Sequence, residues 1–138
     1  MYYWLIPLVA WFLTGIVKFS INTIKYKELA WKYIGYGGMP SNHSAIVGSI
    51  FFYIGLKDGF NTPMAGIAAT MLFIVVMDAL SLRKNIGKQA SVLNKLTFGK
   101  LGGEDKPLRE SIGHKPLEVA AGLLLGFVYA VGFCWLFG

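Results

Sequence analysis

The chain has 138 residues, of which 55% are hydrophobic, 15% aromatic and only 14% charged, and its formal net charge is +6. Soluble domains carry about 25% charged residues, so this composition argues against an ordinary soluble protein, and the length predicts one domain over residues 1–138. The positive charge would serve nucleic-acid binding only on a soluble basic face, which the apolar segments exclude, whereas it suits a membrane protein that meets anionic head groups. A single cysteine, Cys134, excludes an internal disulfide and a cysteine-based zinc site.

Four apolar segments are long enough, or nearly so, to cross a bilayer, namely 2–20, 41–56, 62–82 and 116–137. They predict an all-α integral membrane bundle with about four transmembrane helices. The third segment contains one carboxylate, Asp78, and the fourth contains Glu118. The spacing of Gly122 and Gly126 favours close packing of the last helix on a neighbour. Because four short spans give little internal core, association into a homo-oligomer is also expected.

The loops indicate an orientation for a multi-pass protein of the cell membrane. Basic residues cluster after the first span, and eight more lie between the third and fourth spans: Arg83, Lys84, Lys88, Lys95, Lys100, Lys106, Arg109 and Lys115. With four crossings both loops fall on one face, which the positive-inside rule places in the cytoplasm. The loop 82–115 is expected to carry short helices, and Gly99, Gly102 and Gly103 suggest that it forms a flexible lid.

The residues suited to chemistry fall at that same face. Lys18, Asn22 and Lys25 share one side of the first helix, because they follow i, i+4, i+7 spacing. Ser41 and His43 follow a glycine turn and a proline at the predicted start of the second helix. A helix N-terminus leaves N–H groups unpaired and favours anions, phosphate above all. We therefore interpret this stretch as part of an active site.

The other half of the predicted site comes from the end of the third span and the start of the fourth. Glu118 follows His114 by four residues, so its carboxylate can reach back to the imidazole. Simpler interpretations stand beside the catalytic one: Ser41 as a helix cap, the lysines as interfacial side chains, and Asp78 as a structural partner of Arg83 or Lys84.

Three blocks of sequence, at 37–45, 78–94 and 113–122, resemble the divergent membrane-bound relatives of type-2 phosphatidic acid phosphatases, which are related to acid phosphatases and vanadium haloperoxidases. They include Pro40-Ser41-Asn42-His43 where the wider superfamily has Pro-Ser-Gly-His. Lys25 stands where that superfamily has arginine, and Glu118 where it has aspartate. Arg109 precedes His114 by five residues rather than six, which makes Arg83 a rival for the same role.

The resemblance implies hydrolysis of a phosphomonoester or diphosphate through a phosphohistidine, with no obligatory metal or cofactor. It implies that His114 is the nucleophile, that Glu118 holds its tautomer, and that His43 protonates the leaving oxygen and later activates water. The phosphate ligands it suggests are Lys18, Lys25, Ser41, Asn42, Arg83 and Arg109. Asn22, Asp78 and Lys88 are expected to support them.

Several alternatives remain open at this stage. Phosphatidylglycerol phosphate is the favoured substrate because its terminal monoester lies at head-group depth, but phosphatidic acid and polyprenyl diphosphates also fit. A magnesium-dependent phosphatase would draw oxygen ligands from Asp78, Glu104, Asp105 and Glu118. A non-enzymatic membrane transporter or assembly protein is the alternative from another class, although the polar groups gather at one face instead of lining the membrane's depth.

Overall fold

The structure is a computed structural model that describes residues 3–26, 39–97 and 107–137. Within those ranges helices are the only regular secondary structure and no strand is formed, which confirms the predicted fold class. The elements are α1 (Leu5–Tyr26), α2 (Asn42–Asp58), α3 (Pro63–Met77), the π-helical segment η2 (Asp78–Leu82), α4 (Arg83–Thr97) and α5 (Pro116–Phe137).

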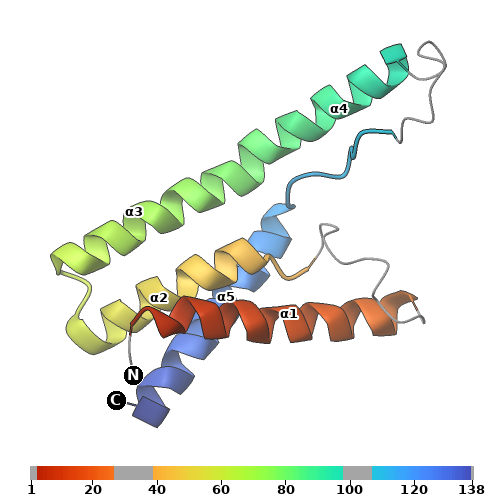
Figure 1. The fold of residues 1–138 in the computed structure, drawn as a ribbon. Coiled ribbons are helices and arrows are strands. Elements are labelled where there is room, and N and C mark those ends of the chain that lie inside the picture. The colour runs from red at the N-terminus through yellow and green to blue at the C-terminus, as the bar shows by residue number, and fades with distance from the viewer. Residues whose placement is uncertain (1–2, 27–38, 98–106, 138) are drawn as a thin grey trace.

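Three helical segments of the described chain are long and apolar enough to cross a membrane: Leu5–Lys25, Pro63–Thr97 and Pro116–Phe137. The second expected span is α2, which has 17 residues and therefore extends for about 25 Å. It packs against α1, α3 and α5 and so forms the centre of the bundle (Figure 1). Its buried positions are mostly small residues, which let these neighbours approach closely.

The closest helix pair is α2 with α5, as the glycine spacing predicts. A Cβ atom on Gly122 would lie 2.4 Å from the carbonyl oxygen of Ser41, and one on Gly126 would lie 2.8 Å from that of Ala45. The Ser41 N–H donates to the carbonyl oxygen of Glu118 over 3.0 Å. The starts of the two helices are therefore fixed to one another.

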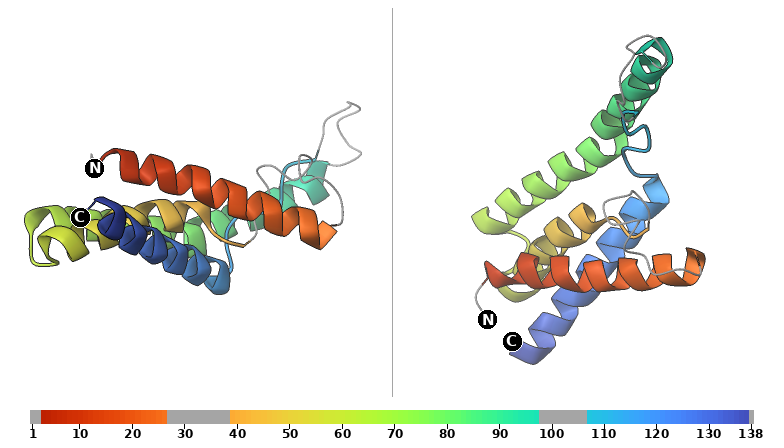
Figure 2. Two further views of the ribbon diagram at one scale, coloured as in Figure 1. Left: turned by 90° about the horizontal axis from the view of Figure 1, so that it is seen from below. Right: turned by 45° about the vertical axis from the view of Figure 1, so that its right-hand side comes forward.

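The chain from Pro63 to Thr97 forms one long helical segment, in which η2 joins α3 to α4. Thr62 caps its start, accepting from the Ala65 N–H over 3.2 Å, and Pro63 occupies the first turn. Figure 1 and the right-hand view of Figure 2 show α4 continuing away from the other helices.

This continuous helix differs from the expected third helix that ends at residue 82. No proline interrupts residues 83–97, and a single glycine at position 87 is tolerated, so the helix continues into the expected loop. The loop was predicted to carry short helices, and α4 is a helix of 15 residues within it. The three glycines that suggested a lid in this loop, Gly99, Gly102 and Gly103, lie outside the described residues.

At the opposite end of the bundle, Tyr3 ties the start of α1 to the end of α2. Its hydroxyl donates to the Asp58 carboxylate, with distances of 2.7 and 2.9 Å to the two oxygens, and this hydrogen bond raises the pKa of Tyr3 to about 12. Beside it, Ile6, Tyr53, Ala130 and Phe133 form a buried core, against which Cys134 also packs. This core therefore stabilises the end of the bundle that is remote from the histidines.

Candidate functional site

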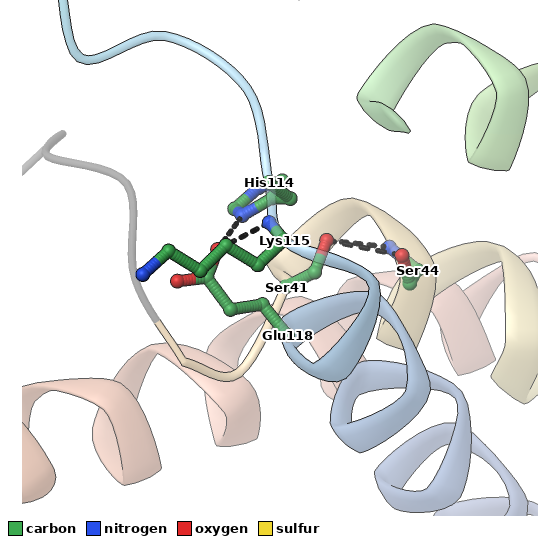
Figure 3. A network of polar contacts seen from close by, with 5 residues as sticks. All are labelled: Ser41, Ser44, His114, Lys115 and Glu118. Carbon is green, nitrogen blue, oxygen red and sulfur yellow. Dashed lines mark hydrogen bonds and ion pairs between the residues drawn. The ribbon is translucent and has the colours of Figure 1, made fainter. Parts of the chain in front are cut away.

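A histidine and a glutamate form a shielded pair at the start of α5. The Nδ1 atom of His114 lies 2.9 Å from Oε2 of Glu118, and the Lys115 N–H donates to the same oxygen over 3.2 Å (Figure 3). The side chains of His114 and Glu118 are 9% and 18% exposed. When Nδ1 carries the proton that is shared with the carboxylate, the second ring nitrogen, Nε2, is left with a free lone pair.

The backbone that carries His114 is held by η2. The His114 N–H donates to the carbonyl oxygen of Ala79 over 3.1 Å. In this segment the Arg83 N–H pairs with the Asp78 carbonyl, the wider spacing of a π-helix, which recurs at functional sites. The backbone torsion φ of Gly113 is +103°, and a Cβ atom there would lie 2.9 Å from the nitrogen of Lys84. Glycine at position 113 therefore allows His114 to dock against the long helix as well as α5.

Asp78 and Arg83 form an ion pair across the π-helical segment, through the Oδ2 and Nε atoms. This is the structural pairing that the sequence suggested as one interpretation of Asp78. The two side chains are 27% and 36% exposed, so the pair is neither buried nor free in solvent. Arg83 uses Nε in this contact, and the guanidinium has further N–H donors.

The second histidine interacts electrostatically with the first. His43 is the second residue of α2 and is exposed, and it interacts electrostatically with His114, Arg83, Asp78 and Lys18. These groups come from α1, α2, η2, α4 and the segment before α5. The fold thus brings together two imidazoles that are far apart in the sequence, next to a cluster of cations.

Ser41 caps α2, as predicted. Its Oγ atom accepts from the Ser44 N–H over 3.4 Å and from the Ser44 hydroxyl over 3.0 Å, and the side chain is fully buried (Figure 3). The Met39–Pro40 peptide bond that leads into this cap is cis. The neighbouring Asn42 has its side-chain oxygen buried without a hydrogen-bond partner. Phosphate binding by Ser41 and Asn42 remains a prediction.

The lysines of α1 lie at different depths along the helix. Lys18 is partly buried and interacts electrostatically with Glu118 and Arg109, which ties both residues to the histidine pair. Lys25 lies seven residues further along, about 10 Å of helix, and is exposed, with the partly buried Asn22 between them. On α4, Lys88 is exposed about one turn beyond Arg83 and Lys84. The structure therefore brings both rival arginines, Arg83 and Arg109, into the electrostatic surroundings of the site.

Three features of this arrangement were assigned no role in the site from the sequence: the carbonyl of Ala79, and Gly113 and Asn94, which lie within the blocks that carry the family resemblance. Asn94 makes hydrogen bonds to Leu108 and Glu110, on either side of Arg109. Gly113 gave a usable signal, because a glycine directly before a candidate catalytic histidine points to an unusual backbone torsion or a close approach. Ala79 gave none, since any residue has a carbonyl group.

The magnesium alternative depends partly on residues that lie outside the described chain, Glu104 and Asp105. Among the residues that the structure does describe, no three His, Cys, Asp or Glu side chains are placed to hold a metal ion together. Asp78 instead pairs with Arg83, and Glu118 with His114.

Comparison with known proteins gives a family match and one named relative. The model of the divergent PAP2 family matches residues 2–129. An uncharacterized membrane protein of Bacillus subtilis strain 168, YuiD, is 31% identical to this chain, and the match covers 88% of this chain and 87% of the relative. No solved structure matches the chain. The relative and the three apolar helices together place the protein in a membrane.

Proposed function

The chain belongs to the divergent PAP2 family, and from this premise we propose that it is a membrane phosphatase that hydrolyses a phosphomonoester on a lipid head group. One observation supports the proposal above the others. The shielded His114–Glu118 pair interacts electrostatically with His43 and Lys18, and His43 also interacts with Arg83. An anion bound among these cations would meet a nucleophile and a general acid together.

In the proposed reaction, Nε2 of His114 attacks phosphorus and the ester P–O bond breaks. His43 gives its proton to the departing oxygen, so the dephosphorylated lipid leaves with a neutral hydroxyl group in place of the phosphate. His43, now neutral, takes a proton from water, whose oxygen attacks phosphorus and breaks the P–N bond. Inorganic phosphate leaves and His114 is regenerated. Glu118 keeps Nδ1 protonated and stabilises the positive charge that the ring carries in between.

Charge stabilisation would account for much of the rate, because phosphoryl transfer depends chiefly on positioning and on neutralising the equatorial oxygens. Arg83, Lys18 and Arg109 are the cations that we assign to this role, with Lys25 as a further candidate at the end of α1. The positive-inside rule, applied to the basic loops, supports a cytoplasmic position for these groups. That orientation favours a phosphate which the cytoplasmic leaflet presents at head-group depth.

Phosphatidylglycerol phosphate is the substrate that we favour, because its terminal monoester extends into the head-group layer. Phosphatidic acid is the second candidate and polyprenyl diphosphate the third. The test is phosphate release by the detergent-solubilised protein from a panel of these lipids, with His43→Ala and His114→Ala as paired variants. Lys57→Ala, which removes an exposed cation from the end of α2 remote from the histidines, is the matched control.

We expect release from at least one of the lipids, a loss of several orders of magnitude in both histidine variants, and an unchanged rate in the Lys57 control. General acid–base catalysis alone is worth about 10²–10⁴-fold. Full activity in both histidine variants would overturn the mechanism. A rate that persists in a metal chelator agrees with a metal-free reaction, whereas a chelator-sensitive rate restored by magnesium would favour the carboxylate-bound metal instead.

A further inference from the structure

Residues 107–113, which we call the strap, run beside α4 and lead into His114 (Figure 1). Asn94 holds the strap with both ends of its side-chain amide. Its Nδ2 donates to the carbonyl oxygen of Leu108 over 2.7 Å and to Oε1 of Glu110 over 2.9 Å, while its Oδ1 accepts from the Leu108 N–H over 2.8 Å. These bonds use both amide N–H donors and the carbonyl oxygen. The two strap residues that they reach flank Arg109.

The rest of the strap fits the same face of α4. Positions 83, 87, 90 and 94 share that face by their spacing, and Gly87 and Ala90 are its buried members. A Cβ atom on Gly87 would lie 2.4 Å from the carbonyl oxygen of Glu110. At its end the strap meets Lys84 at Gly113 and then η2, through the hydrogen bond from His114 to Ala79. The path of the strap is therefore fixed from Asn94 to the catalytic histidine.

Arg109 lies in the middle of this path, between the two strap residues that Asn94 holds. It interacts electrostatically with Lys18, which also interacts with Glu118. Two like charges that face one another gain stability when an anion lies between them. Asn94 of α4 thus holds the backbone beside Arg109, while the charge of Arg109 acts on Lys18 of α1.

We propose that Asn94 is a positioning residue for phosphate binding: by holding Leu108 and Glu110, it presents Arg109 to the phosphoryl oxygens. The inference rests on the proposed function, and it assigns Arg109 a contact with the substrate and Asn94 none. Arg83 keeps its own place beside Asp78 on η2. Both arginines then serve the site, one from the long helix and one from the strap.

The test is Asn94→Asp, which keeps the size of the side chain and the acceptor for the Leu108 N–H. It replaces the donor with a carboxylate oxygen that faces the carbonyl of Leu108 and the carboxylate of Glu110. Asn85→Asp makes the same chemical change at an exposed position of the same helix and is the matched control. Adding Glu110→Gln to Asn94→Asp supplies an amide donor opposite the new carboxylate, so it should restore part of the effect.

We expect Asn94→Asp to raise KM for the lipid phosphate, and the dissociation constant for inorganic phosphate, by about tenfold to 100-fold, the usual worth of a hydrogen bond to a charged group. kcat should change less than KM. In an Arg109→Ala background the same change should add little, because the residue it positions is gone. Additive losses in the double variant, or an unchanged KM in Asn94→Asp, would overturn the inference.

Amide hydrogen exchange over 108–113 supplies a readout that does not depend on activity. Exchange should be faster in Asn94→Asp than in Asn85→Asp, and equal exchange in the two would count against the inference. If Asn94→Asp fails to fold, Glu110→Ala removes one of the three hydrogen bonds and should raise KM in the same direction. If the wild type hydrolyses no lipid but Asn94→Asp still weakens the binding of inorganic phosphate, the inference is supported and the proposed function is refuted. If the wild type hydrolyses lipid phosphate and Asn94→Asp leaves its KM unaltered, the proposed function is supported and the inference is refuted.

Discussion

Gly122 lies where α5 passes closest to the start of α2, so Gly122→Ala tests how closely activity depends on that contact. The added Cβ atom would lie 2.4 Å from the Ser41 carbonyl oxygen, 3.0 Å from Cβ of Ser44 and 3.2 Å from Cβ of Ser41. The first of these atoms belongs to the backbone and cannot rotate away. An ordinary contact begins at 3.4 Å, so the helices must separate by about 1 Å.

Such a shift acts directly on the site. It stretches the 3.0 Å hydrogen bond from the Ser41 N–H to the Glu118 carbonyl and moves Glu118, with His114, relative to His43. Overpacking of this kind typically costs about 1–3 kcal/mol of stability. A misplacement of about 1 Å can lower a rate by about 100-fold. We therefore expect a lower melting temperature and a large fall in kcat.

The assay is phosphate release together with thermal unfolding in detergent, with two further variants of α5 for comparison. Gly132→Ala is the matched control, because nothing lies within 4 Å of its new Cβ atom. Gly126→Ala is intermediate, with contacts at 2.8 Å one turn further from the histidines, and should reduce stability more than activity. If Gly122→Ala proves as stable and active as Gly132→Ala, the reasoning from the helix contact fails.

Three further predictions concern single groups of the site. Glu118→Gln should keep the fold but reduce kcat by about 100-fold or more, because a neutral amide cannot stabilise a charged imidazole; equal kcat would show that the carboxylate is structural. In the first turnover, His43→Ala should lose much less rate on an aryl phosphate than on a lipid phosphate, since a phenolate leaves more readily without protonation; equal first-turnover losses would refute its role as the acid. Hydrogen bonds from Asn94 and Ser91 lower the pKa of Glu110 in the folded protein. Charged Glu110 therefore stabilises the strap at pH values above the pKa that it has in the unfolded chain, and this stabilisation is lost as the pH falls through its lower pKa in the folded protein. Protection of amides 108–113 should therefore fall with acid in the wild type and lose this pH dependence in Glu110→Gln.

The parts of this molecule that could be read from the sequence are those set by local spacing. The apolar segments predict the helices, the serine before the second helix predicts its cap, and the four-residue interval predicts the contact between His114 and Glu118. Gly122 and Gly126 predict a close helix contact, although their spacing alone could not say that α2 is the partner.

What could not be read depends on contacts between distant segments. The continuation of the third helix into α4 is favoured by the strap, which packs on Gly87 and bonds to Asn94, and neither contact has a local signal. The π-helical turn likewise leaves no periodic pattern in five residues. Asn94 belongs to a block of sequence that carries the family resemblance, but its role shows only when Leu108 is placed opposite it. Long-range hydrogen bonds of this kind become visible only in three dimensions.

The central claim is that His43 and His114 act on one phosphoryl group, and the most direct test is to trap it on the protein. His43→Ala, incubated with an aryl phosphate and quenched in alkali, should accumulate a covalent phosphoryl group that peptide mass spectrometry locates on His114, since the base that activates water is missing. The wild type should carry less of it, and the double variant with His114→Ala none. A phosphoryl group on any other residue, or turnover without a covalent intermediate in an active protein, would contradict the account.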